Sequence, residues 1–150
     1  MTRYSFMSIP ISAMESSQKS NGKIHVKSSS IHGTGLFAKE FIAQGEVVIV
    51  WADTKEISRE EFTKLPDSEK HYIDIQDGKI FLVGKPERYV NHSCSSNTIP
   101  GYLCDLAARD IFPGEEITAD YSHFFIPSRQ FQCFCKSAAC RGLVQGRNSE

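Results

Sequence analysis

Apolar residues occur along this chain in short runs or in alternation with polar residues. Both patterns indicate β-strands, because successive side chains of a strand point to opposite faces and a fully buried strand is apolar on both. Six segments show one pattern or the other: residues 24–26, 47–51, 71–75, 79–83, 102–109 and 116–121. The dipeptide Asp77-Gly78, between two of these segments, favours a hairpin. We therefore expect six or seven short strands.

A short helix is predicted near the middle of the chain. Ser58 and Glu61 fit a capping box, in which each side chain accepts a hydrogen bond from a backbone N–H at the start of the helix. Phe62 and Leu65 stand one helical turn apart, and Pro66 ends the element. With one or two such helices beside the strands, the expected fold class is mostly β, a β-rich α+β fold.

Composition and charge narrow the class of protein. The 150 residues include 17 basic and 18 acidic side chains, for a net charge of −1, evenly divided between the two halves. Because this leaves no basic face, we expect no direct nucleic-acid binding. Residues 1–22 lack periodicity and the arrangement of a secretory signal, which predicts a mobile leader. No apolar run approaches the ~20 residues that span a bilayer, so we expect an intracellular protein outside the membrane.

The segment from Gly33 to Ala38 has the form G-x-G-x-x-A, which in a βαβ unit binds a dinucleotide. Only residues 39–44 separate it from the turn at Gly45, whereas a parallel crossover needs at least about 10–12 residues. The sequence therefore argues against a Rossmann unit. Two glycines on either side of Thr34 still allow the backbone to lie against a ligand. A plain glycine loop between strands is the alternative.

The five cysteines, without a secretory signal, indicate metal binding rather than disulfides. Three of them form the pattern C-x-C-x4-C: Cys133, Cys135 and Cys140. A tetrahedral zinc site needs a fourth ligand, for which Cys94 is the first candidate and His92 the second. Cys104 lies within a predicted strand and suits a small buried hydrophobic residue. Free surface thiols are the alternative for the cluster.

Two further segments contain polar residues that have ordinary explanations when each is taken alone. Asn91, His92 and Ser93 can cap and turn the chain, and Asp120-Tyr121 can end a strand. Taken in order with the glycine and cysteine motifs, they resemble the SET-domain family of protein-lysine methyltransferases with its post-SET tail. The four matching motifs are G-T-G at 33–35, E-R-Y-V-N-H-S-C at 87–94, G-E-E-I-T-A-D-Y at 114–121 and C-F-C-K-S-A-A-C-R-G at 133–142.

The resemblance implies a SET-domain fold of small sheets, in which the N-H-S-C and D-Y segments cross in a pseudoknot-like arrangement. It divides the chain into four parts: a leader (1–22), a SET domain (23–126), a post-SET zinc-binding segment (127–143) and a disordered tail (144–150).

Roles of individual residues follow from the resemblance position by position. The residues implied to bind S-adenosyl-L-methionine are Gly33, Thr34, Gly35, Arg88, Asn91, His92 and Tyr121, with Phe134 closing over the cofactor. Tyr121 is also implied to be the catalytic tyrosine at the point of methyl transfer, and Tyr72 to line the lysine channel. The implied zinc ligands are Cys94, Cys133, Cys135 and Cys140.

The implied function is methylation, dependent on S-adenosyl-L-methionine, of a lysine in a basic protein segment such as a histone tail. Between Asp53 and Asp77, where the family's substrate docks, lie eight acidic and four basic residues, a charge that suits a basic partner. An ordinary surface insert with no such partner is the alternative for this segment. We expect a monomer or homodimer, in the nucleus on chromatin if the source is eukaryotic and in the cytoplasm otherwise.

Two departures from the family pattern leave a second function open. Val50 stands where the family often has Glu, and Ala119 where it commonly has an aromatic residue whose space Phe124 or Phe125 would have to fill. A catalytically inactive SET-like module that binds a basic peptide is therefore an alternative, and a small zinc protein without cofactor is a third hypothesis.

Overall fold

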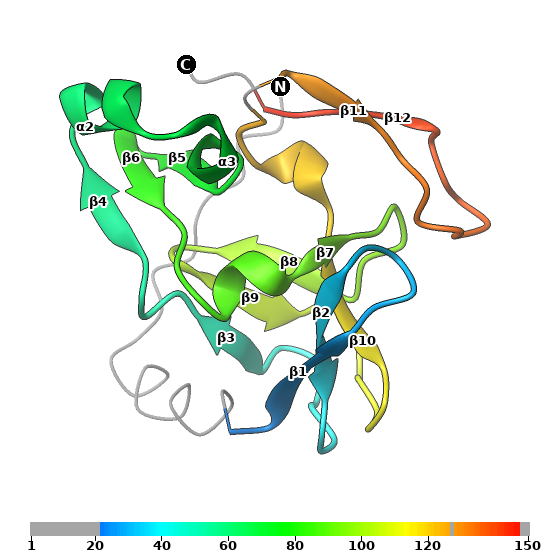
Figure 1. Ribbon diagram of the computed structural model, residues 1–150. Helices are drawn as coiled ribbons and strands as arrows, with labels where there is room; N and C mark the ends of the chain where they lie inside the picture. Colours follow the sequence, from blue (N-terminus) through cyan, green and yellow to red (C-terminus); the bar gives the residue numbers. More distant parts are fainter. Residues whose placement is uncertain (1–21, 127, 148–150) are drawn as a thin grey trace.

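The computed structural model describes residues 22–126 and 128–147, in which short strands form four small sheets (Figure 1). The strand orders are β1-β2-β10-β7, β3-β9-β8, β4-β6-β5 and β11-β12. The strands are β1 (Ile24–Ser28), β2 (Thr34–Ala38), β3 (Val47–Val50), β4 (Lys55–Ile57), β5 (Ile73–Gln76), β6 (Lys79–Leu82), β7 (Asn91–His92), β8 (Thr98–Gly101), β9 (Cys104–Ala107), β10 (Glu116–Ala119), β11 (Gln130–Gln132) and β12 (Leu143–Gln145).

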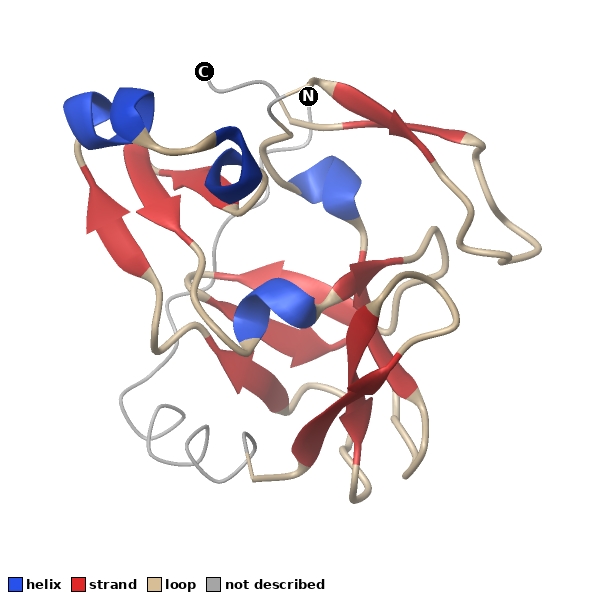
Figure 2. Ribbon diagram, viewed as in Figure 1, coloured by secondary structure: helices blue, strands red, loops and turns tan. Residues whose placement is uncertain are grey.

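Helical segments are short and connect the groups of strands (Figure 2). They are α2 (Arg59–Lys64), α3 (Asp67–Lys70) and the 3-10 turns η1 (Glu87–Tyr89) and η2 (Tyr121–His123). The predicted capping box of α2 is confirmed, because the backbone N–H of Glu61 donates to the Ser58 hydroxyl and the backbone N–H of Ser58 donates to the Glu61 carboxylate. Within the described ranges, no helix is long and apolar enough to cross a membrane.

The strands with clear sequence patterns are confirmed. The run at 47–51 forms β3, and β5 and β6 form the predicted hairpin, with left-handed backbone at Asp77 (φ 49°) and Gly78 (φ 74°). β1 and β2 are antiparallel neighbours, which agrees with the exclusion of a Rossmann unit. The described residues hold more strands than the six or seven expected, because β4, β7, β8, β11 and β12 have only two to four residues and show no pattern of their own.

Two details of the predicted organisation differ from the structure. Val26, which alternates with polar residues as Ile24 does, is 47% exposed, whereas Ile24 is 7% exposed, so only the start of β1 packs into the core. The disordered tail expected from residue 144 is wrong at its start, since β12 pairs with β11 and Val144 is 1% exposed. The predicted leader, apart from Gly22, and residues 148–150 lie outside the described residues.

The main core lies between the first two sheets and brings the family motifs together. Its largest fully buried side chains are those of Leu36, Ile42, Val48, Ile49, Ile111 and Ile117. β10 pairs with β2 through its first half and in parallel with β7 through its second half, where Ala119 lies opposite His92. The chain after β7 then returns to β10, because the Asn97 amide bonds to Glu116 and Thr118. This arrangement places the N-H-S-C segment directly beside the D-Y segment.

Candidate functional site

The glycine turn at residues 33–35 joins β1 to β2 and touches β10. Gly33 has a left-handed backbone (φ 43°), and a Cβ there would face open space. Gly35 has a different requirement, because a Cβ there would lie 2.3 Å from Glu116 Oε1. The local fold therefore needs both glycines, while the open space beside Gly33 leaves its backbone accessible to a ligand. Thr34 between them is exposed.

The side chain of Asn91 connects this turn by hydrogen bonds to β10, an inner strand of the first sheet. Its Nδ2 donates to the carbonyl oxygens of His32 and Thr34, each at 3.0 Å, and to Glu116 Oε1 at 2.9 Å. The same carboxylate oxygen of Glu116 accepts a hydrogen bond from the Ser29 hydroxyl at 2.7 Å. Glu116 is thus the common anchor of the glycine turn and Asn91. Sequence reasoning did not assign it a role, although it is the second Glu of the G-E-E-I motif.

Tyr121 begins η2 and is held at both its backbone and its hydroxyl. The hydroxyl donates to the carbonyl oxygen of Val90, and the backbone N–H donates to His92 Nδ1 at 3.0 Å. Its ring makes edge contacts with the rings of His92, Phe124 and Phe131, with centroids 5.4, 6.4 and 5.9 Å away. Burial raises the pKa of Tyr121 above its ordinary value, so the phenol keeps its proton at neutral pH.

Tyr72 lies under the guanidinium of Arg88, whose carbon is 4.2 Å from the ring centroid. Arg88 also donates to both carboxylate oxygens of Glu69 at 3.2 Å and to the carbonyl oxygen of Val83 at 2.8 and 3.1 Å. In this structure the guanidinium of Arg88 therefore holds the Tyr72 ring in place. Its predicted contact with a cofactor stays a prediction.

The four predicted zinc ligands come together in one cluster. Their Sγ atoms all lie within 4.8 Å of one another, and those of Cys94 and Cys133 are 3.8 Å apart. A tetrahedral site with Zn–S bonds of about 2.3 Å has sulfur atoms about 3.8 Å apart, so the donor set fits zinc. β11 and β12 bring the three C-terminal cysteines to the end of β7, where Cys94 follows.

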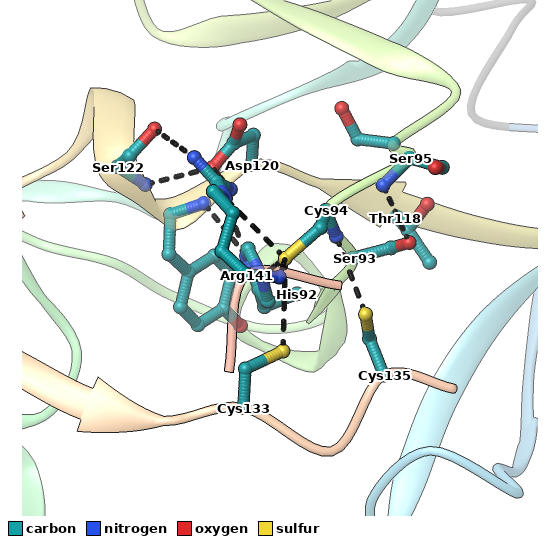
Figure 3. Close-up of polar contacts among 12 residues, drawn as sticks. His92, Ser93, Cys94, Ser95, Thr118, Asp120, Ser122, Cys133, Cys135 and Arg141 are labelled. Atoms are coloured by element: carbon teal, nitrogen blue, oxygen red, sulfur yellow. Dashed lines mark hydrogen bonds and ion pairs between the residues drawn. The ribbon is translucent and has the colours of Figure 1, made fainter. Parts of the chain in front are cut away.

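N–H groups converge on the sulfur of Cys94, as Figure 3 shows. The backbone N–H and the Nε of Arg141 each lie 3.4 Å from it, and His92 Nε2 lies 3.3 Å from it. Because His92 Nδ1 accepts the Tyr121 N–H, its proton is on Nε2 and points at the sulfur. His92 is therefore a hydrogen-bond donor to a cysteine ligand, and the second candidate for the fourth zinc ligand is disfavoured. Such donors stabilise a thiolate.

Arg141 also links the cysteine cluster to the residues that flank Tyr121. Its Nη2 donates to Asp120 Oδ1 at 2.6 Å, and its Nη1 to the Ser122 hydroxyl at 3.4 Å (Figure 3). Burial alone would raise the pKa of Asp120, but the hydrogen bonds from Arg141 and Ser122 hold it below its ordinary value. Arg141 was not predicted as a site residue, although its place in the C-R-G motif was part of the resemblance.

The remaining predicted positions have clear surroundings. Phe134, expected to close over the cofactor, is 68% exposed. Ala119 is buried, and Phe124 packs against both Tyr121 and Trp51, with a Trp51 centroid distance of 5.8 Å. Phe124 is thus an aromatic neighbour of Tyr121, the residue two positions after Ala119. Phe125 instead lines a groove of about 400 Å³ on the β4-β6-β5 sheet, whose walls also include the charged residues Glu56, Arg59 and Lys79.

Buried carboxyl groups near the site were not expected. Trp51 Nε1 donates to Asp105 Oδ2 at 3.0 Å. Burial is the main reason that the pKa of Asp105 rises to about 7, and the carboxylates of Asp74 and Glu87 contribute to the same rise. Asp105 lies next to Cys104 in β9, and both are buried because β9 is the central strand of its sheet. Burial also raises the pKa of the Cys104 thiol to about 12, as suits the predicted hydrophobic role.

The acidic segment between Asp53 and Asp77 is less negative at its surface than its composition indicates. Five of its eight acidic side chains form ion pairs: Glu56 with Lys79, Glu60 with Lys64, Glu61 with Lys55, Asp67 with Lys70 and Glu69 with Arg88. A sixth, Asp74, is buried. The charge of this segment therefore does not by itself select a basic partner.

These features define a β-rich fold with a glycine turn, a partly buried tyrosine and a four-cysteine cluster, and comparison with known proteins identifies its family. The family model described as "SET domain" matches residues 33–122. The chain belongs to the SET-domain family.

Two curated relatives of this chain are both named as histone-lysine N-methyltransferases. The chain is 32% identical over 143 residues to the H3 lysine-4 specific histone-lysine N-methyltransferase of Schizosaccharomyces pombe, covering 81% of this chain and 15% of the relative. It is 30% identical over 131 residues to histone-lysine N-methyltransferase Set2 of Drosophila melanogaster, covering 76% and 6%. The chain thus spans a small part of the length of these relatives.

A solved structure supports the fold. The methyltransferase domain of human histone-lysine N-methyltransferase SETMAR superimposes with a TM-score of 0.56 at 23% identity, over 82% of this chain and 58% of that one. The likeness supports the fold, while the bounds of the SET domain at 23–126 and of the post-SET segment at 127–143 stay predictions.

Proposed function

We propose that this chain is a protein-lysine N-methyltransferase that uses S-adenosyl-L-methionine. The observation that carries the proposal is the fixed position of Tyr121, whose hydroxyl bonds to the carbonyl of Val90 and whose backbone bonds to His92. These contacts put a phenol and a main-chain carbonyl together within a ring of aromatic side chains. In a methyltransferase, this set can orient an amine and exclude water.

The residues beside Tyr121 suit a cofactor. The backbone of Gly33 borders open space, and Asn91 and His92 are fixed to the glycine turn and to β10. We assign the cofactor to the backbone of Gly33–Gly35 and of Asn91–His92, with the exposed Phe134 as a cover and Arg88 as a more remote contact. S-adenosyl-L-methionine, when bound, would supply a methyl group attached to its positively charged sulfonium sulfur.

The chain's own residues prepare the lysine. A lysine amine has a reference pKa of about 10.4, and removing its proton at pH 7 costs about 4.6 kcal/mol. We propose that Tyr72, with Phe124 packed on Trp51, lines the lysine channel, and that these aromatic side chains disfavour the ammonium and so lower this cost. The carbonyl of Val90 and the Tyr121 hydroxyl then orient the neutral amine, and alignment is the main contribution that an enzyme makes to an in-line displacement.

We further assign zinc to the cluster of Cys94, Cys133, Cys135 and Cys140. In this site zinc is structural, since four thiolates leave no open position for substrate. It orders the segment that carries Phe131, whose ring contacts Tyr121, and so completes one wall of the site.

A histone tail is the proposed substrate, and chromatin the proposed place of action. The names of the relatives support this choice, because they describe histone-lysine N-methyltransferases. The surface charge of the β4-β6-β5 region adds little to it, since most of its acidic side chains are already paired.

The experiment that tests the proposal is methyl transfer from isotopically labelled S-adenosyl-L-methionine to a panel of histones and to total cell protein. We expect label on lysine with the native chain and a loss of at least about 10²-fold in kcat for Tyr121→Phe, because the variant removes the hydroxyl at the reacting centre. Tyr102→Phe is the matched control, since Tyr102 is exposed and lies in the turn between β8 and β9.

Equal activity of Tyr121→Phe and the native chain would contradict the catalytic assignment. Binding of a basic peptide without any transfer of label would favour the inactive module, which the unusual residues Val50 and Ala119 leave open. Absence of cofactor binding as well would overturn the proposed function.

A further inference from the structure

Arg141 follows the last cysteine of the cluster and connects two parts of the site. Its Nε and its backbone N–H both donate to Cys94 Sγ at 3.4 Å. The other end of its guanidinium donates to Asp120 Oδ1 at 2.6 Å and to the Ser122 hydroxyl at 3.4 Å. Asp120 and Ser122 are the residues on either side of Tyr121. Figure 3 shows this side chain stretched between the sulfur and the carboxylate.

The main chain at Tyr121 has two supports, and both lead to the same sulfur. On one side, the Tyr121 N–H donates to His92 Nδ1, and His92 Nε2 faces Cys94 Sγ at 3.3 Å. On the other side, Asp120 Oδ1 accepts the Ser122 N–H at 3.0 Å, which starts the turn η2, and also accepts the hydrogen bond from Arg141. The conformation of residues 120–122 is therefore linked to the position of Cys94 Sγ twice, once through His92 and once through Arg141.

The charges explain why an arginine suits this position. Four thiolates around a divalent cation carry a net negative charge, and the Asp120 carboxylate is a second negative group. Arg141 lies between the two groups, and its planar fork donates to them from two separate nitrogen atoms, whereas a lysine has a single nitrogen to reach both. The Arg141 side chain is 40% exposed, so the ion pair alone contributes little to global stability. Its importance lies in the geometry that it fixes.

We propose that Arg141 is a positioning residue, which transmits the ordered state of the metal-bound tail to the main chain at Tyr121. Its importance for catalysis rests on the proposed function above. The structural coupling between the cysteine cluster and residues 120–122 does not, and it is tested separately by hydrogen exchange.

The first measurement is amide hydrogen exchange on the full chain loaded with Co²⁺, whose thiolate absorption bands report whether all four cysteines bind. We expect Arg141→Ala to keep the four-thiolate spectrum, because the ligands and the backbone N–H to Cys94 remain. Exchange of the amides at 121–124 should accelerate about tenfold or more, the effect of losing a charged hydrogen bond. Asp120→Asn should produce a similar increase without altering any residue of the metal site.

Three comparisons make the result specific to Arg141. Arg141→Lys keeps the charge but not the fork, and should give an intermediate exchange rate. Arg109→Ala removes another exposed ion pair, with Glu115, and should match the native chain. The double variant Arg141→Ala with Asp120→Asn should exchange no faster than Arg141→Ala alone, because both changes break one interaction. Exchange in the β5–β6 hairpin, residues 73–82, is the internal reference and should not change.

Kinetics then test the catalytic importance of the coupling. For Arg141→Ala we expect kcat to fall about tenfold or more while KM for a histone peptide changes less than about threefold, since no contact with the peptide is removed. Native exchange rates at 121–124 in cobalt-loaded Arg141→Ala or Asp120→Asn would overturn the proposal. Loss of the four-thiolate spectrum in Arg141→Ala would also overturn it, because the residue would then belong to the metal site itself. A native chain without methyl transfer would refute the proposed function and leave the exchange result to decide the coupling.

Discussion

Asp105 is a carboxyl group that the fold buries with only half of its hydrogen bonds made. It is 2% exposed, and within the described residues its Oδ1 has no hydrogen-bond partner. Trp51 donates to Oδ2, yet burial still raises the pKa of Asp105 to about 7. The group is therefore close to the border between charged and neutral at physiological pH, and it lies in the strand that supports the aromatic wall of the site.

The first prediction concerns the stability of the fold against pH. Because the pKa is near 3.8 in the unfolded chain and about 7 in the folded one, the folded state binds the proton more tightly. The contribution of protonated Asp105 to the free energy of unfolding is fully present below about pH 4 and is lost as the pH rises to about 7. Asp105→Asn should remove this decline and stabilise the protein at pH 8 by roughly 2–4 kcal/mol. Urea unfolding at a series of pH values measures the difference.

The control for this measurement is Asp77→Asn, a change of an exposed carboxyl group in the β5–β6 turn. It should leave the decline between pH 4 and 7 in place. Parallel stability curves for the native chain and Asp105→Asn would show that Asp105 ionises normally in the folded state.

At the scale of the element, β10 is the strand on which the site depends, and a side chain completes its hydrogen bonding. Asn97 is buried, its Nδ2 donates to the carbonyl of Glu116 at 2.8 Å, and its Oδ1 accepts the backbone N–H of Thr118 at 2.9 Å. The amide thus takes the place that a neighbouring strand would occupy. Glu116 in turn anchors the glycine turn, and Tyr121 follows two residues after the strand.

We expect Asn97→Ala to lower the free energy of unfolding by about 2–4 kcal/mol, because it leaves a buried N–H and a buried carbonyl without partners. Asn97→Asp keeps the acceptor for Thr118 and loses the donor to Glu116, so its loss should also be substantial. Chemical denaturation measures both. A loss below about 0.5 kcal/mol for Asn97→Ala, typical of surface positions, would show that water replaces these bonds.

Some elements of this fold could be predicted from the sequence, and other contacts could not. β3, β10 and the β5–β6 hairpin have strong local patterns, and the helix α2 has a local cap, so these elements could be predicted from neighbouring residues. The roles of Asn97, Glu116 and Arg141 depend on partners 19 to 87 residues away. No local periodicity contains such information. The cysteine cluster was predictable because metal ligands leave a spacing pattern, whereas the buried Asp105 leaves none.

At the scale of the whole molecule, the C-terminal hairpin is a separate and weaker unit. In Figure 1, β11 and β12 lie apart from the β4-β6-β5 sheet, and their small core contains Val144, Cys133 and Cys135, with Cys94 and Phe131 packed against it. So little buried apolar surface cannot order a segment of this length without a further constraint. Four cysteine ligands on one metal ion provide such a constraint.

We therefore expect metal removal to act locally. A strong chelator should expose residues 128–147 to trypsin, with cleavage after Arg129, Lys136 and Arg141, while β1 to β10 keep their protection. Mass spectrometry of the fragments identifies the sites. Cys104→Ser, which alters a buried cysteine outside the cluster, should leave the metal content of the protein unchanged. Uniform digestion of the whole chain after chelation would show that the metal supports the entire fold.

The distance along the chain between the cysteines also governs how the protein matures. Cys133 is made 39 residues after Cys94, an interval of about 2–8 s at ordinary rates of synthesis. Tyr121 is made within this interval, before any of the three C-terminal cysteines exists, so Cys94 then has none of its partners in the cluster. Each newly made molecule therefore passes through a stage in which Tyr121 is present while the proposed zinc site still lacks three of its four thiolates.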